Sequence, residues 1–139
     1  MRVQHSEVPV QTGGPVRVHD VTARVREAVR GASVREGLAV VSVPHTTCAV
    51  CVNENEAGLV SDIERLARQV LDPLARDGGF AHDRIDDNAR AHLTSILLGQ
   101  QTTLAVHDGE PVLGTWQSVF LVELDGPRTR RLHVQVLGE

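Results

Sequence analysis

Residues 101–138 read QTTLAVHDGEPVLGTWQSVFLVELDGPRTRRLHVQVLG, and this stretch decides the fold class. It is rich in apolar and β-branched residues, many of them spaced two apart, which is typical of strands with one buried face. Asp108-Gly109 is the strongest hairpin signal in the chain. The C-terminal third is therefore predicted to be strand throughout.

The remainder of the chain mixes helices with shorter strands. Strands are predicted at 2–10, 38–43 and 48–52, and helices at 21–30, 57–71 and 89–98. Asp20 can cap the first helix, Pro73 is expected to end the second, and Gly99 the third. Because helices and strands do not alternate regularly, residues 1–139 are predicted to form one α+β domain. Its sheet should be mostly antiparallel or mixed, with about three helices packed against it.

Composition excludes several classes of function. All 14 basic residues are arginine, so a lysine Schiff base and a P-loop are both excluded, the N-terminal amine apart. The net charge is −4, no basic stripe is visible and aromatic residues are scarce, so no nucleic-acid partner is expected. No apolar run could span a bilayer and no secretory segment is visible, so we expect a cytoplasmic protein without a membrane partner.

The only two cysteines, Cys48 and Cys51, form a CxxC motif that invites a zinc or redox interpretation. The surrounding TCAVCVN is typical of a strand, and residues three apart on a strand point to opposite faces. Such a pair can neither clamp one metal ion nor close a disulfide without leaving the strand. Two small buried thiols are the favoured interpretation.

A first group of polar residues follows two neighbouring strands. His45, Thr46 and Thr47 come after one apolar strand, and Asn53 and Glu54 end the next. The residues are of types that bind ligands, but a solvated turn is an equally good account of them.

A second group lies in the polar loop 76–88 and the helix after it. His82 on the loop and His92 on the helix could bind a divalent metal ion or supply an acid and a base, with Asp83 able to orient a ring. The alternative is that His92 is an interior helix residue and His82 a loop tip. Four further histidines are interpreted as structural or surface residues: His5, His19, His107 and His133.

The third group is Gly114-Thr115-Trp116-Gln117, inside a run predicted to be strand. A glycine in a strand often marks a bulge or a close approach of the backbone to a ligand. Trp116, the only tryptophan, could form the wall of a pocket for a flat ligand, with Gln117 as a polar contact.

Taken in order, these motifs resemble the secondary thiamine-phosphate synthase (YjbQ-like) family from about residue 36 to the C-terminus. The residues that carry the resemblance are HTT at 45–47, NEN at 53–55, Asp62, GFAHD at 79–83, Asp87, AHL at 91–93, Ser95, LLG at 97–99, GTWQ at 114–117, Glu123 and the pair Arg130-Arg131. One departure is Phe80, where the family often has tyrosine. The resemblance implies a compact α+β fold of jelly-roll character and a homotrimer. It also implies a weak ability to join a pyrimidine diphosphate to a thiazole phosphate, with the physiological substrate unknown.

The resemblance also implies roles for individual residues. Catalysis is expected from His45, Glu54, His82, Asp83 and His92. Substrate binding is expected from Thr46, Thr47, Asn53, Ser95, Thr115, Trp116, Gln117 and Arg130, or its neighbour Arg131. A divalent metal ion, Zn²⁺ or Mg²⁺, is expected on His45, His82 and His92.

Two kinds of function remain open at this point. The first is an enzyme whose partner is a small phosphorylated metabolite. The alternative is a non-catalytic protein that binds or senses such a metabolite in the same pocket. A purely structural trimer is less favoured, because a scaffold does not need three histidines beside Glu, Trp and Arg.

Overall fold

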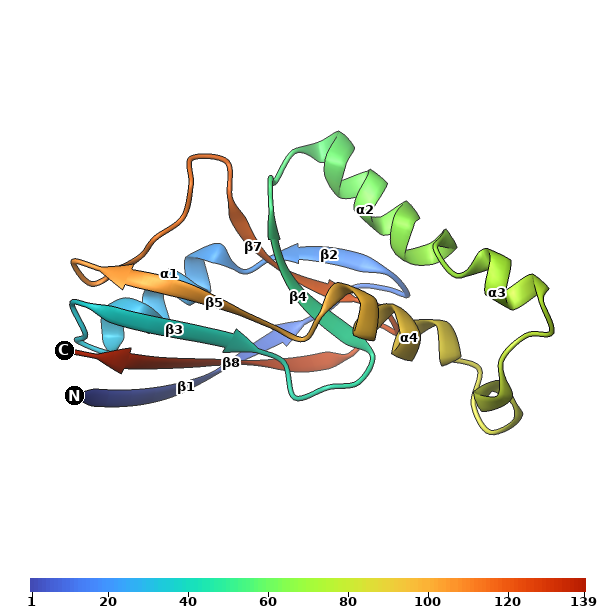
Figure 1. The fold of residues 1–139 in the computed structure, drawn as a ribbon, viewed down its shortest axis with the longest axis horizontal. Helices are drawn as coiled ribbons and strands as arrows, with labels where there is room; N and C mark the ends of the chain where they lie inside the picture. The colour runs from blue at the N-terminus through green and yellow to red at the C-terminus, as the bar shows by residue number, and fades with distance from the viewer.

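The computed structural model describes residues 1–139, and its strands form two antiparallel sheets (Figure 1). Sheet A has the order β1 (Arg2–Gln11), β8 (Thr129–Gly138), β3 (Gly37–Ser42), β5 (Gln101–His107) and β6 (Glu110–Pro111). Sheet B has the order β2 (Arg17–Asp20), β7 (Ser118–Glu123) and β4 (Cys48–Asn53). Every strand pair is antiparallel, and the predicted α+β class is confirmed.

The helices lie close to their predicted positions. They are α1 (Thr22–Gly31), α2 (Ala57–Gln69), α3 (Asp72–Arg76) and α4 (Ala89–Leu98), with a 3₁₀ turn η1 (Ala81–Arg84) in the polar loop. Pro73 does not simply end a helix, because it stands in the first turn of α3, where a missing N–H costs no hydrogen bond. Gly99 ends α4 with a positive φ of 93°, which glycine adopts without steric cost. No helix is both long enough and apolar enough to cross a membrane.

Two local predictions were wrong. The short strand β2 was not predicted, because it is held by its pairing with β7 rather than by its own sequence pattern. The stretch 111–126 was predicted to be one strand, but residues 114–117 form a turn between β6 and β7. The backbone N–H of Gly114 donates to Gln117 Oε1 at 2.8 Å, and the N–H of Gln117 donates to the Gly114 carbonyl at 3.0 Å. This local pair of hydrogen bonds replaces strand pairing.

The predicted hairpin at Asp108-Gly109 is confirmed. It joins β5 to β6 by two residues that both have positive φ, 49° and 78°. This is the backbone conformation of a tight type I′ turn, which glycine adopts without steric cost.

The main core lies between sheet A, sheet B and α1, which sits behind sheet A in Figure 1. Its largest buried members are valines and leucines: Val25 and Val29 from α1, Val41 from β3, Leu121 from β7, and Leu132 and Val134 from β8. The opposite face of sheet B is covered by α2 and α4. Ala67 and Ala91 on those helices pack near Phe120 and Val122 of β7, and their small side chains allow a close approach.

The outer face of sheet A is not covered by a helix. Along β8 the residues alternate between the two faces of the sheet. The buried set is Leu132, Val134 and Val136, and the more exposed set is Arg131, His133 and Gln135. The N- and C-terminal strands β1 and β8 run side by side at this edge (Figure 1).

The two cysteines lie on opposite faces of β4, as predicted. Cys48 belongs to the main core, whereas Cys51 packs against the core between sheet B and the helices, and both thiols are free. Burial raises the pKa of the Cys48 thiol to about 11, so this side chain is an uncharged core residue.

A buried ion pair between Glu123 and Arg130 links the two sheets. Glu123 is 0% exposed and Arg130 5%. Nη2 and Nε of Arg130 donate to the two carboxylate oxygens at 2.6 and 2.8 Å. The carboxylate also accepts from Thr12 Oγ1 and from the backbone N–H groups of Leu124 and Asp125. Five donors thus surround the charge, the condition under which a buried carboxylate is tolerated.

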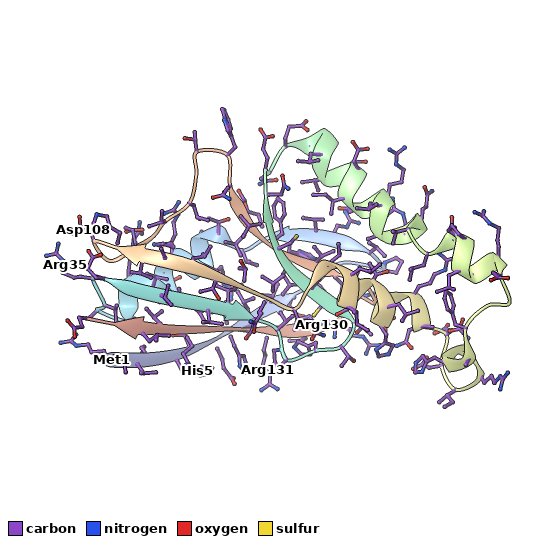
Figure 2. All side chains as sticks on the ribbon, in the orientation of Figure 1. Met1, His5, Arg35, Asp108, Arg130 and Arg131 are labelled. Carbon is purple, nitrogen blue, oxygen red and sulfur yellow. The ribbon has the colours of Figure 1, made fainter.

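The same arginine reaches sheet B. Its Nη2 donates to Thr47 Oγ1 at 2.9 Å, immediately before β4, and Leu124 N donates to the Thr47 carbonyl. Figure 2 shows Arg130 near the middle of the molecule, away from the end that carries Arg35 and Asp108. The network therefore joins the end of β1, the start of β8, the end of β7 and the start of β4.

Two glycine-containing turns close over this network. A Cβ at Gly126 would lie 2.6 Å from Glu123 Cγ and 2.6 Å from the Gly13 carbonyl oxygen. A Cβ at Gly14 would overlap the Gly126 backbone. No larger residue fits at either position without moving the carboxylate or the opposing turn.

Replacing Glu123 with Gln leaves the buried Arg130 guanidinium without a counter-charge. We expect the free energy of unfolding to fall by about 3 kcal/mol, measured by urea denaturation. Glu110→Gln is the matched control, because Glu110 pairs with Arg26 and Arg30 at the surface, where water weakens ion pairs. Similar losses in the two variants would contradict a special role for the buried pair.

The stability should also depend on pH through Glu123. Burial alone would raise the pKa of this carboxyl group, but hydrogen bonds from Arg130 and Thr12 outweigh burial, so the pKa lies below its ordinary value of 4.5. The contribution of the ionised group is present above that value and is lost as pH falls through the folded-state pKa. The stability difference between wild type and Glu123→Gln should therefore shrink in urea titrations from about pH 6 to about pH 3. A difference that stays constant with pH would refute this assignment.

Candidate functional site

The structure brings together two of the three histidines predicted to act. The rings of His82, on η1, and His92, on α4, meet edge to face with centroids 4.8 Å apart and an interplanar angle of 79°. Both rings line an open pocket of about 430 Å³, whose other walls are Leu74, Gly79, Phe80, Ala81, Ala89 and Leu93. Phe80 thus contributes an apolar wall here. The pocket combines an apolar lining with two groups that can transfer protons.

Hydrogen bonds from the loop side hold this pair in place. His82 Nε2 lies 2.9 Å from Asn88 Oδ1, and Asn88 Nδ2 donates to Asp125 Oδ2 at 3.0 Å. Burial would raise the pKa of Asp125, but the bonds from Asn88 and Arg128 outweigh burial and lower it. The ionised carboxylate of Asp125 thereby orients the Asn88 amide, and this amide orients the imidazole of His82.

Asp83 has a positioning role in this arrangement. Its Oδ1 accepts the backbone N–H of Ala89 at 3.2 Å, at the first residue of α4. It therefore satisfies a free N–H at the start of the helix that carries His92. Asp83, which was predicted to be catalytic, therefore supports the start of the helix that carries His92. It forms no hydrogen bond with either imidazole ring.

His45 lies apart from the His82–His92 pair, beside β8. Its Nε2 accepts the backbone N–H of Arg131 at 3.0 Å, and its carbonyl accepts from Gln100. Burial, followed by the charges of Arg130 and Arg131, lowers the pKa of His45. The ring is therefore a neutral acceptor at Nε2, which places its proton on Nδ1.

A third neighbourhood holds the predicted tryptophan. Trp116 and Gln117 share a small hollow of about 230 Å³ with Asn53, Glu54 and Val52. The indole is 72% exposed at the tip of the turn between β6 and β7. Thr115 stands beside it in the same turn and is also exposed.

Of the four other residues predicted to contact substrate, three are buried and one is exposed. Ser95 is buried and donates to the Cys48 carbonyl at 2.7 Å, so it ties α4 to β4. Thr47 is buried against Arg130, whose charge is balanced by Glu123. Of this group only Thr46 faces solvent.

The predicted three-histidine metal site does not form within one chain. In one group of three residues, His5, Glu7 and His133, the potential ligand atoms all lie within 4.8 Å of one another. No group that contains His45, His82 or His92 meets this distance. The connection from β3 to β4 turns His45 toward β8, whereas His82 and His92 lie on η1 and α4. The donors therefore do not fit a shared zinc or magnesium ion in this arrangement.

Sequence reasoning missed the residues whose role depends on strand pairing or on the loop. His5 and His133 were interpreted as structural or surface residues, and Glu7, Asn88 and Asp125 were not proposed as functional. The i,i+2 spacing of His5 and Glu7 on a predicted strand was the available signal, because it places both side chains on one face. The pairing of β1 with β8, which adds His133, has no local signal in the sequence.

Comparisons with known proteins agree with the family resemblance. The profile of the family described as UPF0047 protein YjbQ-like matches residues 6–139. A UPF0047 protein of Methanothermobacter thermautotrophicus is 41% identical over 139 residues, which cover 100% of this chain and 95% of that protein. One from Archaeoglobus fulgidus is 41% identical over 131 residues, covering 94% and 99%.

Solved structures show the same fold. A YbjQ-like protein of unknown function from Sulfolobus solfataricus superposes with a TM-score of 0.93 at 37% identity, over 99% of both chains. A hypothetical protein from Aeropyrum pernix superposes with a TM-score of 0.91 at 40% identity, over 98% of this chain and 99% of that one. These names state no reaction, so thiamine-phosphate synthase activity stays a prediction. The extent of these matches establishes that the chain belongs to the YjbQ-like family of UPF0047 proteins.

Proposed function

We propose that this protein is an enzyme that acts on a small phosphorylated metabolite and uses the His82–His92 pair for proton transfer. The observation that carries the proposal is the edge-to-face contact of two imidazoles at an apolar pocket. Imidazole gives and takes protons near neutral pH, and the pocket offers an apolar surface to a ring. The chain from His82 through Asn88 to Asp125 supports a defined ring orientation, which acid–base catalysis requires.

The family resemblance suggests a reaction that joins a pyrimidine diphosphate to a thiazole phosphate. In that reaction the thiazole nitrogen forms a bond to the carbon that bears the diphosphate. The bond from this carbon to the diphosphate oxygen breaks, and diphosphate leaves with the electron pair. A protonated imidazole of the pair would donate its proton to the departing oxygen. No step in this scheme passes through a metal ion, since the three predicted ligands do not meet in one chain.

Arginine is the one permanently charged side chain that could hold a phosphate, because the chain has no lysine. Arg130 is unsuited to this role, since it is buried and paired with Glu123. Arg84 is a better candidate, because it is exposed, forms no salt bridge and lies on the same 3₁₀ turn as His82. We therefore include Arg84, in place of Arg130, as the phosphate-binding residue of the proposal.

A non-catalytic metabolite-binding protein is the second candidate. The observation that favours it is the pairing of Arg130 with Glu123, which removes one predicted source of stabilisation for a leaving group. The homotrimer implied by the resemblance belongs to either candidate, and sedimentation of the purified protein tests it.

Replacement of His82 or His92 with Ala should lower turnover by about a hundredfold or more, because each removes one proton-transfer group. The measurement is product formation from the pyrimidine diphosphate and thiazole phosphate, followed by mass spectrometry with purified protein. His107→Ala is the control, since this exposed ring at the end of β5 pairs with Glu36 and does not line the pocket.

Three outcomes of this experiment are informative. Loss of turnover in both pocket variants with unchanged thermal unfolding supports the enzyme. Saturable binding without product supports the metabolite-binding protein instead. Equal turnover in wild type and in both variants would exclude the pair as the catalytic group.

Asn88→Ala tests the orientation of His82. Without the amide, the ring loses its hydrogen-bond partner and the link to Asp125. We expect kcat to fall while KM changes little, with a smaller loss than in His82→Ala, because the ring stays present but turns more freely. A rise in KM at constant kcat would assign Asn88 to substrate binding.

A further inference from the structure

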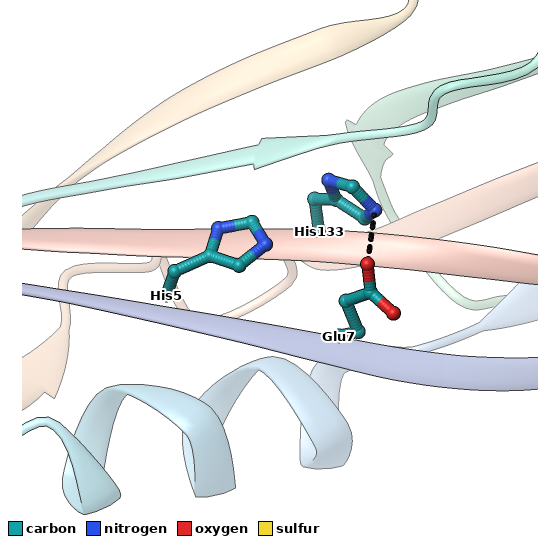
Figure 3. Close-up of side chains that lie close together, drawn as sticks. All are labelled: His5, Glu7 and His133. Carbon is teal, nitrogen blue, oxygen red and sulfur yellow. Dashed lines mark ion pairs between the residues drawn. The ribbon is translucent and has the colours of Figure 1, made fainter.

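We propose that His5, Glu7 and His133 form a binding site for a divalent transition-metal ion of the zinc class on the outer face of sheet A. Figure 3 shows the three side chains converging from β1 and β8. The site lies apart from the His82–His92 pocket and does not rest on the proposed function.

Strand register places the three side chains together. β1 and β8 are antiparallel, with Glu7 opposite His133 and His5 opposite Gln135. Because side chains alternate along a strand, His5 and Glu7 share one face. His133 is the direct cross-strand neighbour of Glu7 and the diagonal neighbour of His5. The backbone ladder thus fixes the Cα positions of all three residues before any ligand binds.

The distances suit a metal ion. One nitrogen or oxygen from each residue lies within 4.8 Å of the others. His133 Nε2 lies 3.3 Å from Glu7 Oε1, and the rings of His5 and His133 have centroids 4.9 Å apart. A tetrahedral zinc ion with bonds of about 2.0 Å separates its ligand atoms by about 3.3 Å. The Glu7–His133 pair already has this spacing, and only the His5 ring must move closer.

His133 supplies a second, independent observation. Its Nε2 atom is buried and has no hydrogen-bond partner, although Glu7 Oε1 lies 3.3 Å away. The alignment of the two groups is therefore wrong for a hydrogen bond. A buried polar atom without a partner is costly, and natural structures contain few of them. A metal ion between the ring and the carboxylate would satisfy this atom.

The donor set selects the class of metal. Two imidazoles and one carboxylate favour zinc, cobalt or nickel, whereas magnesium and calcium prefer oxygen ligands alone. Arg131 Nη1 lies 3.7 Å from Glu7 Oε2, which leaves Oε1 free to bind the ion. The side chains of Glu7 and His133 are 49% and 26% exposed, so a water molecule can take the fourth position. The bound ion would cross-link the edge strand β1 to β8.

Zinc titration of the metal-stripped, tag-free protein tests the site by calorimetry, with cobalt absorption as a report on coordination geometry. We expect one ion per chain in wild type. His5→Ala and His133→Ala should each weaken zinc binding by at least about tenfold. Replacing a residue that only supports a metal ligand typically lowers metal affinity by about that factor, and removing a ligand itself should cost at least as much. His107→Ala is the matched control, because this exposed imidazole also lies beside two carboxylates but lacks a second ring.

Stability provides a second readout. Zinc should raise the thermal unfolding temperature of wild type and His107→Ala but not of His133→Ala. His5 is exposed, so His5→Ala keeps the test valid even where His133→Ala folds poorly. Wild-type affinity in both ligand variants would overturn the proposal. So would binding that is lost in His82→Ala and retained in His5→Ala, because it would place the ion at the other histidine pair.

Discussion

The contact between Glu123 and Arg130 is the interaction on which the joining of the two sheets depends. A carboxylate with no exposed surface persists only because an arginine, a threonine hydroxyl and two backbone N–H groups saturate its oxygens. The two residues end β7 and begin β8, and Thr47 brings in the start of β4. Apolar packing between the sheets does not specify direction, whereas this bidentate pair does. Through Thr47, Arg130 also contacts the connection that carries His45.

The candidate residues lie in separate places in the fold, and His45 is the one next to this buried pair. His45 follows β3 and bonds to the backbone of Arg131, next to the buried pair. His92 belongs to α4, which covers the far side of sheet B together with α2, and His82 lies on η1 shortly before α4. Trp116 stands on the turn before β7. Of the pockets within one chain, the one beside α4 is the one that joins two imidazoles to an apolar lining. Two imidazole pairs result, one at that pocket and one on the outer face of sheet A.

The elements with local signals were predictable. The strand β3 and the helix α2 follow directly from apolar spacing, and Asp108-Gly109 is a turn that the residues themselves encode. The opposite orientation of Cys48 and Cys51 follows from strand geometry alone. The motif residues pointed to the His82–His92 pocket, because an imidazole on a loop and another on the next helix are close in the chain. The position of His45 relative to them was not predictable, because it depends on a hydrogen bond to a strand 86 residues away.

The sequence by itself determined the class of fold, the family and the types of chemistry available: histidine, carboxylate and arginine, without lysine. These properties depend on residue identity and on local periodicity. Tertiary structure alone decided which side chains meet. Arg130 became a structural cation because folding buried it against Glu123, and His5 became a neighbour of His133 because β1 pairs with β8. Such contacts join residues far apart in the chain, and their register is set by the packing of whole sheets, so no short stretch of sequence encodes them.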